Sequence, residues 1–252
     1  MRRHILACLA GYCVLSIYQT NLTSTAFAAD TPLDIDDYVV IENFATSSLD
    51  SLPSGWSWRG KDNDKPKLYA VRETNGQRYL AAQDTGLSVA LFKRANWNPQ
   101  NYPIMTWCWR ADDLPPGADE RYTETNDSAA GVYVMVSKTF LLGIPRMIKY
   151  AWSTTLAKGT TGRRKGIGRP WVIVLESGPE KLGQWIFEEI DLARDHKLTF
   201  KRDLPNKIIA IAVLTDANQT RSYAEAAYAD FRAWPKAALG HIPNYCASLA
   251  SE

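Results

Sequence analysis

Short runs of apolar, β-branched and aromatic residues recur along the chain, and turn-forming residues separate them. In the clearest run, at 104–110, alternation places Trp107 and Trp109 on one face of a strand and Cys108 and Arg110 on the other. Segments rich in Asn, Asp and Gly lie between the earlier runs and are typical of turns between strands. We therefore predict strands at 38–44, 68–72, 79–82, 87–92, 104–110, 130–137, 148–153, 171–176, 185–190, 208–214 and 223–233.

This pattern predicts an all-β protein with one short helix, at 191–201. Many short strands with turn signals between them are typical of an antiparallel two-sheet β-sandwich, and neither a βαβ alternation nor an internal repeat is present. We expect a single domain over residues 38–234. The segment 235–252 lacks alternation, and we expect it to be a tail that lies on the surface.

The first 28 residues have the three parts of an export signal. Arg2 and Arg3 form the positive start, 5–18 is mainly apolar, and Ala26-Phe27-Ala28 is a small-x-small cleavage site. No later window approaches the roughly 20 apolar residues that a membrane helix needs. We expect residues 1–28 to be a signal peptide, and the mature chain to be periplasmic or extracellular, without a transmembrane segment.

Cleavage of this leader would change both the charge and the cysteine content. The chain has 29 basic and 27 acidic residues, and loss of Arg2 and Arg3 leaves a nearly neutral protein, which argues against nucleic acid as a partner. The two cysteines that remain are Cys108 and Cys246, and an exported protein can form disulfides. Two interpretations stay open: a bridge that ties the tail to a strand, or a buried Cys108 and a free Cys246 thiol.

Carboxylates gather in the loop at 112–127, between two predicted strands. Glu120 and Asp127 are the candidate functional acids, and Trp109 and Trp152 are candidate aromatic platforms for a sugar ring. The alternative is that the tryptophans fill the core and that Asp127 only fixes the loop.

Two later segments also carry candidate ligand-binding groups. Asp216 and Asn218 follow an apolar strand, where they would either bind a ligand or form a turn through their own backbone. The segment 158–169 is rich in glycine and arginine. It would either bind phosphate or carboxylate groups, or form a solvated hairpin tip. Its basic residues are Lys158, Arg163, Arg164, Lys165 and Arg169.

Most catalytic motifs are missing from the chain. After the leader only His196 and His241 remain, and no nucleophile elbow, P-loop, dinucleotide turn or Cys-x-x-Cys is present. The string at 189–194 resembles the Glu-x-Asp-x-x-Glu strand of β-sandwich glucanases, but Arg194 stands where the second glutamate is required. We therefore reject retaining glycosidase chemistry by that motif.

Several blocks of the chain together resemble the bacterial family called domain of unknown function 3047. They include Trp107-x-Trp109-Arg110, Asn126-Asp127-Ser128-Ala129-Ala130, Lys149-Tyr150-Ala151-Trp152, Val174-Leu175-Glu176-Ser177-Gly178 and Tyr228-Ala229-Asp230-Phe231. The resemblance extends from about residue 40 to residue 234, and the family name implies no activity.

A broader similarity is to jelly-roll carbohydrate-binding modules, which implies a sandwich of jelly-roll type. Such modules often open with an acidic residue before an aromatic one and close with an Asp-Phe strand, as at Glu42 and Asp230 here. The resemblance implies that these two carboxylates could hold a structural calcium ion. Two acids alone do not fill a calcium shell, and solvent-facing acids at sheet edges are the alternative.

The sequence thus favours an exported, non-catalytic ligand-binding protein whose partner is a glycan or another component of the cell envelope. One alternative is a polysaccharide hydrolase or lyase that uses Glu120 and Asp127. The other is a structural envelope protein without a small ligand. Apart from the calcium ion, we expect no cofactor, and the oligomeric state is left open.

Overall fold

The structure is a computed structural model, and it describes residues 37–59, 68–138, 143–166 and 168–250. All of these belong to one compact unit, Leu33–Glu252. The expected signal peptide lies outside the described residues. In the part that the structure describes, no helix has the length and hydropathy of a membrane span.

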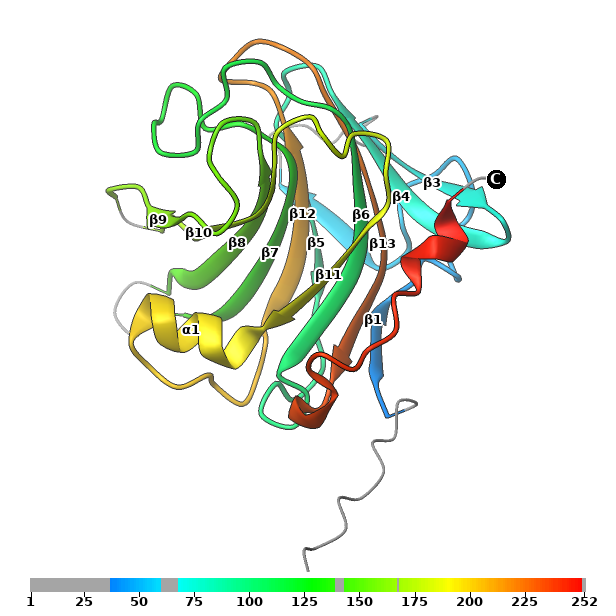
Figure 1. Ribbon diagram of the computed structural model, residues 1–252, viewed down its shortest axis with the longest axis vertical. Coiled ribbons are helices and arrows are strands. Elements are labelled where there is room, and N and C mark those ends of the chain that lie inside the picture. The colour runs from blue at the N-terminus through cyan, green and yellow to red at the C-terminus, as the bar shows by residue number, and fades with distance from the viewer. Residues whose placement is uncertain (1–36, 60–67, 139–142, 167, 251–252) are drawn as a thin grey trace, which may run out of the picture. The chain divides into compact units, whose positions relative to one another are not determined.

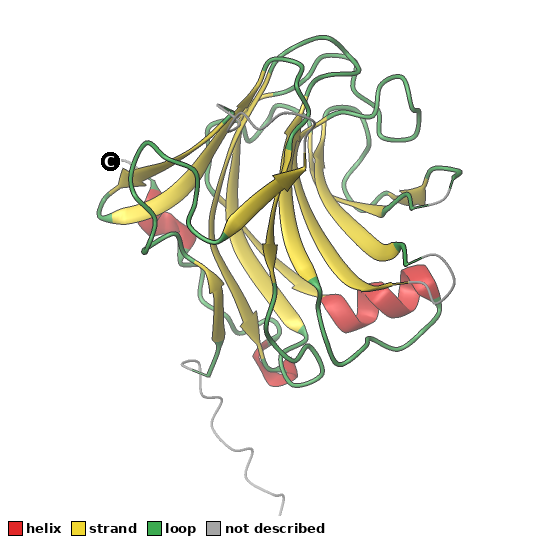
Figure 2. Ribbon diagram, turned by 180° about the vertical axis from the view of Figure 1, so that it is seen from behind, coloured by secondary structure: helices red, strands yellow, loops and turns green. Residues whose placement is uncertain are grey.

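Two β-sheets face each other, as Figures 1 and 2 show. Buried apolar and aromatic side chains fill the space between them. The predicted all-β, two-sheet sandwich is therefore confirmed. Sheet A has the order β11-β6-β13-β4-β3, and β1 also pairs with β13. Its strands are β1 (Val39–Glu42), β3 (Tyr69–Thr74), β4 (Gln77–Asp84), β6 (Ile104–Asp113), β11 (Ile186–Asp191) and β13 (Ala224–Trp234).

Sheet B has seven strands in the order β2-β5-β12-β7-β8-β10-β9. They are β2 (Trp56–Arg59), β5 (Ala90–Arg94), β7 (Ser128–Lys138), β8 (Pro145–Ser153), β9 (Thr161–Arg163), β10 (Trp171–Ser177) and β12 (Ala210–Asp216). The pair β8–β10 is parallel, although we expected an antiparallel fold. A parallel pair needs a long connection, and residues 154–170 supply it.

Among the described residues the one α-helix, α1 (Leu192–Phe200), lies where we predicted it. Asp191 caps its first turn, because the carboxylate accepts a hydrogen bond from the Arg194 amide. Tyr150 in sheet B donates a hydrogen bond of 3.1 Å to Asp195 on the helix. The helix therefore connects to both sheets, since it follows β11 of sheet A directly.

The C-terminal segment packs on sheet A through two short 3₁₀ turns, Lys236–Ala238 and Cys246–Leu249. Cys246 forms a disulfide with Cys108 on β6. Leu249 packs beside this bridge against Ala229 of β13. Of the two interpretations that the sequence left open, the structure has the bridge, and both cysteines are buried.

Candidate ligand-binding site

The outer face of sheet B carries polar side chains that are nevertheless buried. On β8, Tyr150 and Trp152 point into the core, so alternation turns Lys149 and Ser153 to the opposite face. Tyr133 of β7 lies directly across from Lys149 in the strand pairing. Lys149 is only 2% exposed, so other parts of the chain must cover this face.

A chain of hydrogen bonds connects Lys149 to the acidic loop. The Lys149 ammonium donates to Ser128 Oγ at 2.7 Å, and the Ser128 hydroxyl donates to Glu120 Oε1 at 2.6 Å. Ser153 donates to Glu120 Oε2 at 2.7 Å. Both carboxylate oxygens of Glu120 are thus bound, and the loop at 112–127 is fixed to β7 and β8.

Glycine at position 131 allows Lys149 to take this path. A Cβ atom there would lie 3.0 Å from Lys149 Cε and 3.2 Å from the carbonyl oxygen of Leu214. The lysine chain therefore lies over the backbone of β7 at the one residue that has no side chain, and it reaches Ser128 farther along the same strand.

The charged groups of this cluster shift each other's pKa values. Burial opposes the positive charge of Lys149, but Tyr133, Glu120 and Asp216 outweigh that effect and raise the lysine pKa. Burial raises the pKa of Asp216 to about 6; Lys149 lowers it and Asp127 raises it. Burial is also the main reason that the pKa of the Tyr133 phenol is raised.

The acidic loop and the basic segment meet at a pocket of about 210 Å³ beside this cluster. Glu120 and Arg121 of the acidic loop line it, together with Arg163 and Arg164 of the basic segment. Leu156 and Val172 supply apolar surface; the other lining residues are Thr160 and Gly162. The two charged segments that the sequence singled out separately therefore form one site.

Arg163 and Arg164 both lack a carboxylate partner among the described residues, and Arg164 also makes no hydrogen bond there. Arg121 forms an ion pair with Asp119, and Arg163 donates to the carbonyl of Arg169. No carboxylate among the described residues lies within ion-pair distance of Arg164. Burial and the like charge of Arg169 lower the pKa of its guanidinium. An anionic ligand would relieve both effects.

Among the described residues, Asp127 and Asp216 accept hydrogen bonds within the protein, whereas the side-chain oxygen of Asn218 does not. The fully buried Asp127 carboxylate accepts hydrogen bonds from the Gln219 and Thr220 amides and from the Thr220 hydroxyl. It therefore ties the end of the acidic loop to the loop after β12. Asp216 accepts a long bond of 3.5 Å from the Asn218 amide, and Asn218 Oδ1 is buried without a partner among the described residues.

Trp109 and Trp152 do not form a platform for a sugar, so this expectation is corrected. Both rings are fully buried between the sheets, with centroids 6.0 Å apart. Their indole nitrogens donate to Glu188 and to the carbonyl of Gly178. The rings face the core because alternation along β6 and β8 places them there, together with Trp107.

Glu42 and Asp230, the two residues of the expected calcium site, each have a cationic partner in the structure. Glu42 accepts hydrogen bonds from the Trp56 indole and the Lys93 ammonium, whereas Asp230 forms an ion pair with Arg232. A shared ion would have to displace both cations. Residues 37–250, where they are described, contain no group of three or more His, Cys, Asp or Glu side chains suited to a metal ion.

Sequence reasoning missed Lys149, Ser128, Ser153 and Tyr133. The alternation of β8 does place Lys149 opposite to Tyr150 and Trp152, and this was the available signal. It could not show that loops from distant parts of the chain cover that face.

A family model described as protein of unknown function (DUF3047) matches residues 54–232. A search among curated proteins found no match to this chain.

Solved structures with a similar arrangement share little sequence with this chain. The K1 cleaved adhesin domain of Lys-gingipain from Porphyromonas gingivalis is 14% identical with a TM-score of 0.36, and the match covers 77% of this chain and 96% of that one. The family 30 carbohydrate-binding module of a cellulosomal cellulase from Clostridium thermocellum is 10% identical with a TM-score of 0.38, over 69% and 86%. The xyloglucanase domain of NopAA from Sinorhizobium fredii is 7% identical with a TM-score of 0.36, over 74% and 95%. At these values the likeness says nothing about what this chain binds.

Proposed function

This chain belongs to the family of proteins of unknown function DUF3047, and from its side chains we propose that it is a non-catalytic binding protein for an acidic carbohydrate. It would act in the periplasm or at the cell envelope, as its leader suggests. The observation that carries the proposal is the pocket between the acidic loop and the basic segment, where Arg164 lacks an acidic partner among the described residues.

The chemistry of the pocket suits a sugar that carries a carboxylate. A guanidinium binds a carboxylate through two parallel hydrogen bonds, and the bond strengthens where water is partly excluded. Leu156 and Val172 offer apolar surface to the C–H groups of a sugar ring. Binding sites of this kind combine apolar surface with a few placed polar groups.

Several features argue against catalysis at this site. A general base works best when its pKa lies near the working pH. The pKa values of Tyr133 and Lys149 are both raised, and Asp216, with a pKa of about 6, does not line the pocket. Glu120 accepts hydrogen bonds from two serine hydroxyls. Asp127, the other acid of the hydrolase or lyase alternative, is fully buried and bound to the loop after β12.

Replacement of Arg164 tests the proposal. We expect the Arg164→Gln variant to bind a polyuronate oligosaccharide about 10- to 100-fold more weakly than the native protein, because a charge-assisted hydrogen bond contributes about 1.5–3 kcal/mol. Isothermal titration calorimetry with polyuronate, phosphorylated and neutral oligosaccharides measures the affinity and separates a carboxylate from a phosphate ligand.

Lys165→Gln is the matched control, because Lys165 is exposed on the same segment and does not line the pocket. This variant removes the same charge and should keep native affinity. Equal binding by both variants, or no binding of any acidic oligosaccharide by the folded native protein, would refute the proposal. Release of reducing ends from the polyuronate would instead favour the enzyme alternative.

A further inference from the structure

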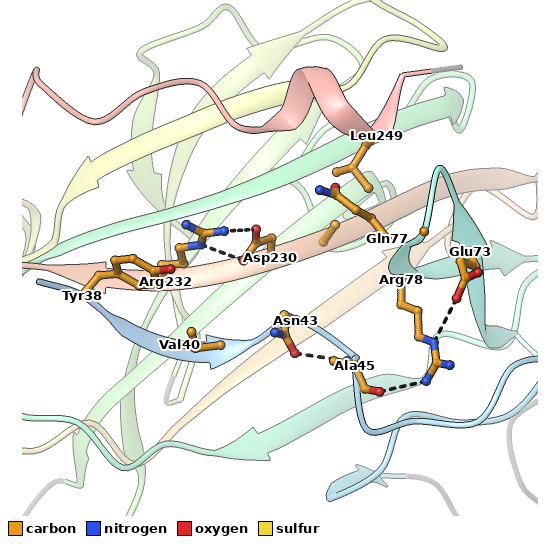
Figure 3. A pocket seen from close by; sticks show the side chains of 12 residues that line it. Tyr38, Val40, Asn43, Ala45, Glu73, Gln77, Arg78, Asp230, Arg232 and Leu249 are labelled. Atoms are coloured by element: carbon orange, nitrogen blue, oxygen red, sulfur yellow. Dashed lines mark hydrogen bonds and ion pairs between the residues drawn. The ribbon is translucent and has the colours of Figure 1, made fainter. Parts of the chain in front are cut away.

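A second pocket, of about 430 Å³, lies on the outer face of sheet A (Figure 3). It forms where two strands share one side of β13. Along β13, the pairing with β4 ends at Tyr228, opposite Leu80. The pairing with β1 begins at Phe231, opposite Glu42. Ala229 and Asp230 lie between these two pairings and line the pocket.

The backbone of β13 between these two pairings is unusual. The pairing of β13 with β6 shifts register between Ala229 and Arg232, and Asp230 has a φ of 48°, in the left-handed region that non-glycine residues rarely adopt. Bulges of this kind are frequent beside functional sites, because they redirect side chains. Here the bulge directs Asp230 and Arg232 toward the pocket, and Figure 3 shows both side chains beside it.

The side-chain oxygens of three lining residues already accept hydrogen bonds within the protein. Both Asp230 oxygens accept from Arg232, at 2.8 and 2.5 Å. Asn43 Oδ1 accepts from the Ala45 amide, and Gln77 Oε1 accepts from the Ser248 hydroxyl. These bonds hold the pocket together, and each oxygen keeps a second lone pair that could accept from a ligand hydroxyl.

Donor groups also remain available. The side-chain nitrogens of Asn43 and Gln77 have no partner among the described residues. The same holds for one terminal nitrogen of each arginine, Arg78 Nη2 and Arg232 Nη1. Arg78 uses its other nitrogens for the Ala45 carbonyl and Glu73. The lining thus offers N–H groups from four side chains to an acceptor-rich ligand.

The charges of the lining cancel, which distinguishes this pocket from the one on sheet B. Arg78 is paired with Glu73, and Arg232 with Asp230. A ligand anion would gain from the arginines but would be repelled by the two carboxylates. A neutral ligand that carries many oxygen atoms fits these donors without that repulsion.

We propose that this pocket is a second ligand site, specific for a neutral sugar of a polysaccharide. Sugar hydroxyl and ring oxygens would accept hydrogen bonds from Asn43, Gln77, Arg78 and Arg232, and the volume lies within the range of small-molecule sites. The site lies on the other sheet from the pocket with Arg164 and does not depend on the function proposed for that pocket.

The double variant Asn43→Asp, Gln77→Glu tests this site. Each replacement keeps the oxygen that bonds within the protein and removes the N–H donors. We expect at least 10-fold weaker binding of a neutral hexasaccharide of glucose, xylose or mannose, measured by calorimetry with each sugar. The Arg164→Gln variant should bind the same neutral sugar as well as the native protein, which separates this site from the first.

The matched control is Gln100→Glu with Asn101→Asp, two exposed residues that do not line the pocket. It adds the same charges and should leave the affinity unchanged, and thermal unfolding confirms that both double variants are folded. The proposal is overturned if no neutral hexasaccharide binds the native protein, or if the Asn43–Gln77 variant binds it equally well. Displacement of a labelled peptide library from this pocket, with no effect of sugars, would indicate a peptide site instead.

Discussion

At the scale of single residues, Glu188 is a carboxyl group whose protonation should change on folding. It lies on β11, is buried, and accepts a hydrogen bond of 3.0 Å from the Trp109 indole. Burial and the nearby Glu176 carboxylate raise its pKa from 4.5 to about 7, although Lys158 and Lys181 partly oppose the rise. Between pH 4.5 and about 7, Glu188 in the folded chain therefore keeps a proton that it has lost in the unfolded chain.

Glu188 should therefore make the protein less stable as the pH rises from about 4.5 to 7, by up to about 3 kcal/mol. Glutamine cannot ionise and can still accept the indole hydrogen bond. We expect Glu188→Gln to match the native protein at pH 4.5 and to exceed it in free energy of unfolding at pH 8. Urea denaturation at a series of pH values measures this difference.

The control for this experiment is Glu189→Gln, on the outer face of the same strand. There a glutamine can still accept the hydrogen bond that Glu189 takes from the Gly240 amide. Its pH profile should follow that of the native protein. If Glu188→Gln shows the native profile too, the carboxyl group is not protonated in the fold.

Gly131 is a second residue with a measurable role. In Gly131→Ala the new methyl group would press on Lys149 and on the Leu214 carbonyl, and the strand backbone cannot move away easily. We expect a loss of about 1–3 kcal/mol in unfolding free energy, as for other overpacked sites. Gly162→Ala, where a Cβ atom would meet nothing within 4 Å, should cost little in the same urea experiment. Equal losses would contradict this account.

The sequence indicated individual residues of the site but not their partners. Glu120 and Arg164 were recognisable because each belongs to a segment of unusual charge. Their meeting depends on the connection from β8 to β10, which carries the basic segment back over sheet B, and no local pattern encodes that path. The tryptophans were ambiguous for a related reason: alternation shows that two rings share a face, but not whether another sheet covers it.

At the scale of elements, hydrophobic alternation located most strands and the helix. It missed β2 and β9, which have four and three residues, because so short a run shows no clear period. It also missed the parallel pairing of β8 with β10, since strand direction depends on the connection between strands and not on their own residues.

The disulfide is the element-scale feature with the clearest predicted effect. It joins residues 138 positions apart, so in the unfolded chain it would close a long loop. We expect the Cys108→Ala, Cys246→Ala variant to lose about 3–5 kcal/mol of unfolding free energy, and its segment after Trp234 to be cut early in limited proteolysis. The native protein in reductant should show the same loss of unfolding free energy and the same early cleavage. It keeps both sulfur atoms, so this comparison separates the effect of the bridge from that of the missing side-chain atoms. Unchanged stability in both cases would rule out a stabilising bridge.

At the scale of the whole molecule, the two sheets keep their apolar surface inside and present chemically different outer faces. Sheet B carries the buried Lys149 cluster and the pocket with the unpaired Arg164. Sheet A carries the charge-balanced pocket lined by Asp230 and Arg232, and the C-terminal segment that the disulfide holds. The core aromatic residues thus serve the sandwich itself, and both proposed ligand sites lie on the two outer surfaces.

The place of β13 also determines when the chain is able to fold. This last strand lies in the middle of sheet A, between β6 on one side and β4 and β1 on the other, and β12 holds a similar place in sheet B. Neither sheet is complete until nearly all of the chain has been synthesised, and such long-range pairing is slow. The growing polypeptide therefore stays open until its last strands arrive. Late closure of this kind would suit the export that we propose, because an exported chain crosses a membrane before it folds.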